Sequence, residues 1–187
     1  MSRRDTRAAI VDAAVAILGR DGAEGLSASA LAREVGISKA TLFHHFSSID
    51  EIPLVAFERM IARGLEVDIP ARAGLGEIMA ALGAGNFALV DARRDFLRAY
   101  FVFVARAMFD PAMAALVRRS GDALLARMRT LLRPHVGTDA EAAALARLAA
   151  LTLDGLAVHL MAFDDRAEIE AAWRLFATLV GDQRRQA

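Results

Sequence analysis

The sequence predicts an all-α protein of about nine helices, and three observations support that prediction. Alanine, the best helix former, is the commonest residue, and only four prolines interrupt 187 residues. Apolar residues recur with a 3.6-residue period along almost the whole chain, and almost no segment alternates with the period of two that marks a strand. The sequence contains no tandem repeat or low-complexity linker, and its length favours one or two compact units.

Three helices are expected within residues 6–46, because each has a capping residue and a stop signal. The expected N-caps are, in order, Asp5 or Thr6, then Ser27, then Ser38. Gly22 stands where the first helix should end, and Gly36 should break the chain after the second. We therefore expect a long first helix followed by two short ones, over residues 28–35 and 39–46.

Six further helices are expected between residue 50 and the C-terminus. Pro53 fits the first turn of a helix capped by Asp50 better than one that begins at Ser48. Pro111 after Asp110 marks the first turn of another helix. Thr138 or Asp139 can cap the eighth helix, and Asp165 precedes the ninth. The expected spans are residues 51–65, 75–90, 95–108, 111–134, 139–163 and 166–180.

Composition excludes several classes of protein. Apolar residues make up 56% of the chain and charged residues 25%, which excludes a disordered chain. The absence of cysteine excludes disulfides, thiolate metal sites and cysteine nucleophiles. Arginines interrupt the apolar stretch 96–109, and the stretch 148–163 is short for a membrane span and carries Asp154. The N-terminus also lacks the pattern of a signal peptide, so we expect a cytoplasmic protein with no membrane partner.

The most informative segment is residues 28–46. One face of the helix expected over residues 28–35 carries the large apolar side chains of Leu31 and Val35 and the small one of Ala32. The small side chain of Ala32 lets a second helix approach closely. The outward positions of the next helix carry hydrogen-bonding side chains that suit phosphates or base edges: Ser38, Lys39, Thr41, His44 and His45. This pattern indicates a helix-turn-helix whose second helix enters the DNA major groove, and an ordinary helical hairpin is the alternative.

The wider stretch 6–52 resembles the DNA-binding domain of the TetR-type (tetracycline-repressor-like) regulators. The matching strings are Gly25-Leu26-Ser27, Leu31-Ala32, Val35-Gly36-Ile37-Ser38 and Thr41-Leu42-Phe43-His44-His45-Phe46. The resemblance implies a helix-turn-helix domain at residues 1–49 and a helical ligand-binding and dimerisation domain at residues 50–187. By residue match, it implies DNA contacts at Ala28, Ser29, Lys39, Ala40, Thr41, Phe43, His44 and His45.

Two residues depart from the family's pattern. Phe43 stands where the family usually has a tyrosine, and Ile49 where it usually has a lysine, so two phosphate donors are missing. Residues 1–50 carry six basic and six acidic side chains, so net charge does not compensate. An N-terminal arm with Arg3, Arg4 and Arg7 could reach an adjacent groove, or it could be a solvated terminus.

The fifth and sixth expected helices carry more aromatic and methionine side chains than their size requires. Plain core packing is one interpretation, and an effector pocket with a few polar groups is the other. The candidate ligand contacts are Met79, Asn86, Phe87, Tyr100, Phe103 and Met108. A pocket of this kind predicts a small apolar or planar effector.

The eighth expected helix is apolar nearly all round, which predicts burial on two sides and therefore a second subunit. The resemblance likewise implies a dimer bundle built from the last two helices. The candidate interface residues are Leu156, Leu160, Ile169, Trp173, Phe176 and Val180.

No catalytic or cofactor-binding motif is present in the sequence, and we expect neither a cofactor nor a metal. His44 and His45 point about 100° apart on a helix and cannot share one ion well. Asp164 and Asp165 are better explained as a helix cap than as an acid pair. The main hypothesis is a ligand-responsive homodimeric repressor that binds a pseudo-palindromic operator on double-stranded DNA. A helical ligand-binding dimer with weakened DNA binding and an α-helical enzyme are the alternatives.

Overall fold

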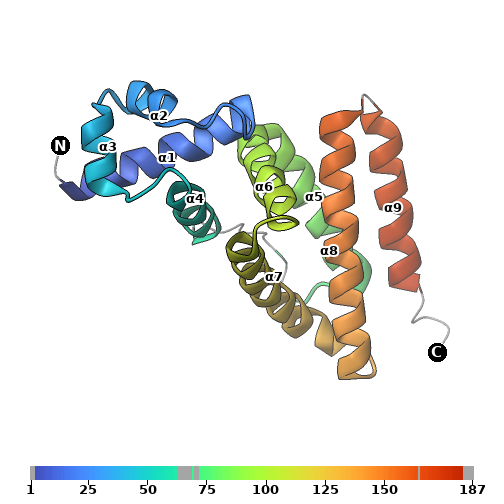
Figure 1. The fold of residues 1–187 in the computed structure, drawn as a ribbon. Helices are drawn as coiled ribbons and strands as arrows, with labels where there is room; N and C mark the ends of the chain where they lie inside the picture. Colours follow the sequence, from blue (N-terminus) through green and yellow to red (C-terminus); the bar gives the residue numbers. More distant parts are fainter. Residues whose placement is uncertain (1–2, 63–68, 70–71, 164, 183–187) are drawn as a thin grey trace. The chain divides into compact units, whose positions relative to one another are not determined.

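The computed structural model describes residues 3–62, 69, 72–163 and 165–182. Over these ranges it contains nine α-helices, one short 3-10 helix and no strand, which confirms the all-α fold class (Figure 1). The elements are α1 (Arg3–Asp21), α2 (Ala28–Val35), α3 (Lys39–His45), α4 (Glu51–Ala62), α5 (Leu75–Ala92), α6 (Arg94–Ala107), α7 (Pro111–Leu132), η1 (Arg133–His135), α8 (Asp139–Ala162) and α9 (Arg166–Asp182).

The helices form two compact units. The first unit comprises residues 1–65 and 93–120, and therefore holds α1 to α4, α6 and the start of α7. The second unit comprises residues 66–92 and 121–187, and holds α5, the rest of α7, α8 and α9. This division differs from the expected functional boundary after residue 49, because α4 and α6 both pack against α1 and join its core.

The first unit has a core built around α1. Ile10, Ala14 and Ile17 are almost fully buried on one stripe of this helix. Phe57 of α4 and Phe103 of α6 meet edge to face there, with ring centroids 5.4 Å apart. Gly19 lets α6 approach α1 so closely that a Cβ at this position would overlap the Asp95 carbonyl. The helix-turn-helix region therefore shares one core with α4 and α6.

The second unit is arranged around α5, which packs against both α8 and α9. Trp173 of α9 is buried, and its indole N–H donates a 3.1 Å hydrogen bond to the carbonyl oxygen of Met79. Arg166 at the start of α9 forms an ion pair of 2.7 Å with Asp91 at the end of α5. Helices α8 and α9 form a hairpin whose long sides run together (Figure 1).

Most helix ends lie where their capping residues predict. Ser27 and Ser38 cap α2 and α3, and Thr138 forms a capping box with Glu141 at the start of α8. Asp110 accepts hydrogen bonds from the N–H groups of Ala112 and Met113, and so caps α7. The caps are local interactions, which is why the sequence pattern alone identifies them.

The first helix is the exception, because α1 begins at Arg3, upstream of the expected caps Asp5 and Thr6. Asp5 lies inside the first turn, where its charge complements the helix dipole. The fourth helix was expected to reach Leu65, which lies outside the described residues; its described part ends at Ala62.

Helices α5 and α8 are long and apolar enough to cross a membrane by length and composition alone. The stretch 148–163 was expected to be too short for a membrane span. The helix α8 is longer than that stretch, with 24 residues rather than 16. One or two such helices are weak evidence for a membrane span, since core helices pass the same test. In the second unit, α5 and α8 pack against each other.

Candidate nucleic-acid interface

Helices α2 and α3 form the helix-turn-helix, and their inner faces explain its geometry. Leu31 and Ala32 of α2 and Leu42 of α3 are buried in the first unit. Gly36 has φ of 75°, a left-handed conformation that glycine adopts without strain, and it ends α2. The Ile37 N–H then donates a 2.9 Å hydrogen bond to the Ala32 carbonyl, which closes the turn.

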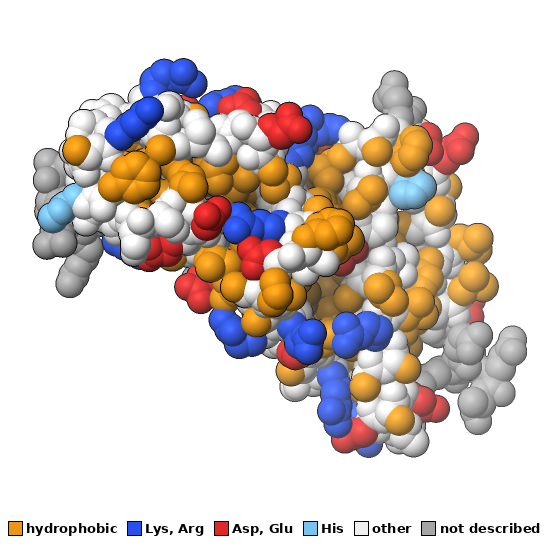
Figure 2. All heavy atoms as spheres, viewed as in Figure 1, with side chains coloured by type: hydrophobic (Ala, Val, Ile, Leu, Met, Phe, Trp, Pro, Cys, Tyr) orange, Lys and Arg blue, Asp and Glu red, His pale blue; other side chains and the backbone are white. Residues whose placement is uncertain are grey.

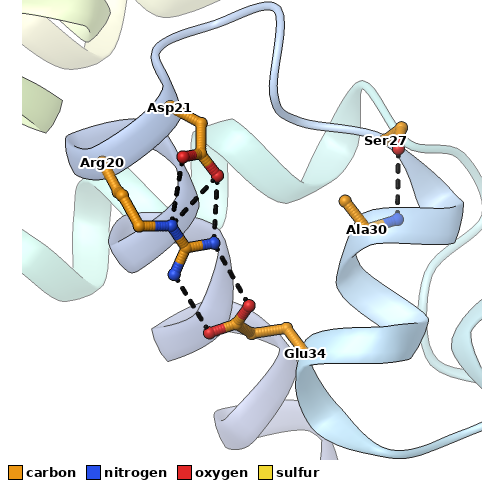
Figure 3. A network of polar contacts seen from close by, with 5 residues as sticks. All are labelled: Arg20, Asp21, Ser27, Ala30 and Glu34. Carbon is orange, nitrogen blue, oxygen red and sulfur yellow. Dashed lines mark hydrogen bonds and ion pairs between the residues drawn. The ribbon is translucent and has the colours of Figure 1, made fainter.

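An exposed ion-pair network braces α2 against the end of α1 (Figure 3). The Arg20 guanidinium lies 2.9 Å from a carboxylate oxygen of Asp21 and 3.2 Å from one of Glu34. The side-chain hydrogen bonds to Asp21 and Glu34 raise the pKa of Arg20 above its ordinary value. Arg20 is thus engaged by two carboxylates and does not add to the positive charge available for DNA.

Arg7 on α1 is engaged in a different way. Its guanidinium carbon lies 4.5 Å from the centroid of the Phe46 ring, a cation–π contact. A nitrogen of the same guanidinium lies 3.9 Å from a carboxylate oxygen of Glu51 at the start of α4. The side chains of Arg3 and Arg4 lie outside the described part of the chain. Arg7 therefore contacts the residues that follow α3 and helps to hold the end of this helix in place.

The outer arc of α3 is exposed and carries no acidic residue. It consists of Lys39, Phe43, Ala40 and His44, in that order around the helix. Phe43 is 48% exposed. The hydroxyls of Ser38 and Thr41 lie 2.9 Å apart and form a hydrogen bond with each other. This face of α3 presents one cation, two apolar groups and one imidazole. An α-helix fits into the major groove of DNA, so these groups could reach base edges there.

The other expected DNA contacts lie around this arc. Ser29 is exposed near the start of α2, while Ala28 beside it packs partly against the core. His45 is half-buried, and its ring lies 5.6 Å from that of His44. Ile49, where the family usually has lysine, packs partly against the core of the first unit. The structure therefore gathers the expected DNA contacts on α2 and α3 and turns Ile49 inward.

The six expected effector contacts lie in different units. Met79, Asn86 and Phe87 are on α5 in the second unit, whereas Tyr100, Phe103 and Met108 belong to the first. Phe103 is buried against Phe57, while Met108 is 74% exposed.

Asn86 is one of two described residues, with Asp165, that have a buried side-chain oxygen without a hydrogen-bond partner. Its Nδ2 donates a 3.2 Å hydrogen bond to the Leu153 carbonyl, while its Oδ1 is buried without a partner in the described structure. A hollow of about 540 Å³ lies elsewhere in the second unit, and none of the expected contacts lines it. Its lining residues are Ala126, Arg129, Thr130, Arg133, Pro134 and Asp139.

Three of the residues expected at a dimer interface are instead buried within their own chain. Trp173 is 4% exposed, and Leu156 and Leu160 are also buried. The apolar stripe of α9 faces α5, where a Cβ on Gly83 would overlap the Trp173 indole. Ile169, Phe176 and Val180 follow the same stripe and are half-buried. Their own chain leaves Trp173, Leu156 and Leu160 little surface for a partner, and their place in a subunit interface stays a prediction.

The exposed apolar side chains of α8 and α9 are a different set, and none of them is among the candidate interface residues. They are Leu148, Leu151, Val158, Leu175 and Leu179. Hydrophobic side chains gather over α8 and α9 on the face drawn in Figure 2. Their spacing, three and seven residues on α8 and four residues on α9, was the available signal. Asp154 lies one turn from Leu151 and Val158, and burial raises the pKa of its carboxyl.

The described residues contain no group of three or more His, Asp or Glu side chains that could hold a metal ion. Asp165 precedes α9, and its backbone carbonyl accepts hydrogen bonds from the N–H groups of Glu168 and Ile169. This is a role at the helix start, whereas its neighbour Asp164 lies outside the described residues.

Two family models match the chain. "Bacterial regulatory proteins, tetR family" matches residues 10–54, and "BetI-type transcriptional repressor, C-terminal" matches residues 77–185. HTH-type transcriptional regulator BetI from Brucella abortus (strain 2308) is 27% identical over 115 residues, which are 60% of this chain. The match spans 58% of the length of that relative. Its counterpart from Agrobacterium fabrum is 29% identical over 161 residues, 82% of this chain and 75% of the relative.

Solved structures of transcriptional regulators share the fold. One from Rhodococcus sp. Rha1 is 28% identical with a TM-score of 0.71, and the match covers 96% of each chain. One from Saccharomonospora viridis, in complex with choline, is 21% identical with a TM-score of 0.68 and 94% coverage of each chain. A TetR-family regulator from Agrobacterium tumefaciens has a TM-score of 0.77 at 19% identity, covering 96% of this chain and all of that one. With a helix-turn-helix at residues 28–45 and a regulator's C-terminal domain matched over residues 77–185, the chain belongs to the TetR family, a family of bacterial transcriptional regulators rather than of enzymes.

Proposed function

We propose that this chain is a homodimeric, effector-responsive repressor that binds a pseudo-palindromic operator through α3. The observation that supports DNA binding best is the outer arc of α3, which exposes Lys39, Phe43, Ala40 and His44 without an acidic neighbour. A helix with this surface, braced on α1 and α2, suits insertion into the major groove. Action on an operator implies that the protein works in the bacterial cytoplasm.

The exposed leucines and valine of α8 and α9 support the proposed dimerisation. Contiguous exposed apolar surface on a soluble domain marks an interaction site, and homodimers with two-fold symmetry are the commonest assemblies. Two copies related by a two-fold axis would present two α3 helices to two half-sites, which predicts an operator with inverted symmetry. The repressor role is supported by the description of the family model that matches residues 77–185.

The proposed effector is a small molecule, apolar or planar, with one or two polar groups. The buried Asn86 Oδ1 has no partner among the residues that the structure describes, so it could accept a hydrogen bond from a ligand donor. Choline, bound to the Saccharomonospora viridis regulator, and imidazole, bound to another protein of the same fold, are the first compounds to test. An effector shifts the protein between conformations only as far as its affinities for the two differ.

Selection of bound DNA from a random pool tests the proposal. The wild-type chain should enrich an inverted repeat, and Lys39→Ala should weaken binding to it. Arg174→Ala, which changes an exposed arginine on α9 of the second unit, is the matched control and should leave operator binding unchanged. Failure to enrich any sequence would instead favour a ligand-binding dimer that has lost DNA affinity, which the missing donors at Phe43 and Ile49 would explain.

The effector is tested separately by thermal unfolding with choline, imidazole and a library of hydrophobic compounds. A ligand at about 100 times its Kd should add roughly 2.7 kcal/mol to the free energy of unfolding. A true effector should also release the selected operator, whereas a compound that stabilises the protein without releasing DNA is not the effector.

A further inference from the structure

Phe43 differs from the other large apolar side chains of the helix-turn-helix region. Of the described residues 5–61, it is the one large hydrophobic side chain that lies exposed, at 48%. The others of this region are buried or partly buried against the core of the first unit. Phe46, three residues later, is 2% exposed.

The neighbours of Phe43 define what its ring can contact. Around α3 it lies between Lys39 and Ala40, which are one turn away on the same arc. Both of these side chains are exposed, and Ala40 adds a second apolar group beside the ring. The buried Leu42, about 100° from Phe43 around the helix, anchors α3 to the core. The ring therefore forms an apolar surface flanked by one cation.

A phenyl ring cannot do what a tyrosine does at this position, because it has no hydroxyl to donate to a phosphate. In the major groove, the apolar feature that distinguishes one base pair from another is the C5-methyl group of thymine. Alanine and phenylalanine side chains are among those that contact it. The ring of Phe43 thus matches one specific group in the groove and matches the phosphate backbone poorly.

We propose that Phe43, with Ala40 beside it, contacts the C5-methyl group of one thymine in each operator half-site and so determines the base preference there. This inference rests on the proposed insertion of α3 into the major groove. Phe43 is then a specificity-determining residue, and the cation of Lys39 next to it serves a neighbouring base or phosphate.

Replacing thymine by deoxyuridine tests the contact, because this change removes one methyl group and leaves base pairing intact. After selection of an operator, each thymine of both half-sites is replaced in turn. We expect one symmetry-related thymine pair at which loss of the methyl weakens binding, by roughly fourfold per half-site from the burial of one methyl group. Replacing both members of the pair should therefore weaken binding roughly fifteenfold.

Variants of Phe43 separate a direct contact from an effect on DNA shape. Phe43→Ala, which leaves only small methyl groups at positions 40 and 43, should reduce the preference for thymine over deoxyuridine, while Phe43→Tyr, which keeps the ring, should retain it. Because Phe43 is exposed, neither change should alter the thermal unfolding of the protein. A penalty that is undiminished in Phe43→Ala would show that the ring does not make the contact and would overturn the inference.

The outcomes distinguish this inference from the proposed function. An operator whose affinity is insensitive to every deoxyuridine replacement would overturn the role of Phe43 and leave the regulator hypothesis intact. A wild-type protein that enriches no DNA sequence would overturn both.

Discussion

Trp173 on α9 lies in the space that Gly83 on α5 leaves open. A Cβ on Gly83 would overlap the indole ring, and the indole N–H donates to the carbonyl oxygen of Met79 four residues before Gly83. This close approach turns the apolar stripe of α9 toward α5. The surface of α9 that stays exposed is consequently the other one, with Leu175 and Leu179.

Gly83→Ala should lower the free energy of unfolding of the second unit by about 1–3 kcal/mol, because the added methyl forces the indole out of place. Trp173 is the single tryptophan of the chain, so its fluorescence during denaturation reports this packing directly. Gly121→Ala is the matched control. A Cβ there meets nothing within 4 Å, and an alanine within α7 should stabilise the helix by up to about 1 kcal/mol. Equal effects of the two changes would contradict the packing described for Gly83.

The helix ends could be predicted from the sequence, whereas the partners of the apolar stripes could not. Caps such as Ser27 and Thr138 act on backbone groups within three residues, so their pattern is visible in the sequence. The stripe with Trp173 predicts burial correctly, but its period does not say whether a neighbouring helix or a second chain covers it. The missing information was the pairing of Gly83 with Trp173, which are 90 residues apart in the sequence.

The candidate DNA interface was more predictable than the effector residues for the same physical reason. Helices α2 and α3 are adjacent in sequence and joined by one tight turn at Gly36, so their residues must lie together. The expected effector contacts instead belong to α5 and α6, which are consecutive in the chain but belong to different compact units. Short loops therefore do not ensure that neighbouring helices share a core.

The exposed leucines of α9 provide a test of the dimer. Leu175→Glu combined with Leu179→Glu should yield monomers in sedimentation velocity and weaken operator binding, because charges would enter an apolar interface. Both side chains are mostly exposed, at 60% and 58%, so the isolated fold should survive. Phe176 is a poorer target, because its ring lies 5.2 Å from that of Trp173 within the chain.

Leu124→Glu is the control for this experiment. Leu124 is a 50% exposed leucine on α7, and it should tolerate the charge without dissociating the dimer. An intact dimer in the double variant of α9 would show that the subunits associate through another surface.

Asp154 makes stability depend on pH in an unusual direction. Burial raises the pKa of its carboxyl above the ordinary 3.8, so the folded protein holds this proton more tightly than the unfolded chain. Stability contributed by this group therefore falls as pH rises from about 3.8 through the folded-state pKa. Asp154→Asn should raise Tm at pH 7 and flatten the pH dependence across that interval.

Asp110 provides the opposite case. The Met113 N–H and the Arg106 side chain hold its pKa below the ordinary value, so its contribution is present at neutral pH and is lost as pH falls through the folded-state pKa. Asp110→Asn should accordingly lower Tm at pH 7. If Asp154→Asn also lowers Tm at pH 7, the prediction for Asp154 is contradicted. Its carboxylate would then be stabilised by a hydrogen bond or ion pair with a partner, such as a second subunit.

Ile49→Lys tests how the helix-turn-helix lies against the DNA backbone. Each lysine that neutralises a phosphate contributes about −0.9 to the dependence of log K on log salt, so one new lysine per subunit should steepen the slope by nearly two in a dimer. Binding to all sequences should tighten alike, because a phosphate contact carries no base information. Ile49 packs partly against the core, but a lysine stem can keep its methylenes there while the ammonium reaches solvent.

Phe43→Tyr is the matched comparison: it adds a neutral hydroxyl, so it should tighten binding without changing the slope. An unchanged slope for Ile49→Lys in a protein of unaltered Tm would place the start of α4 away from the phosphates, and the docking implied by the family would then not hold for this chain.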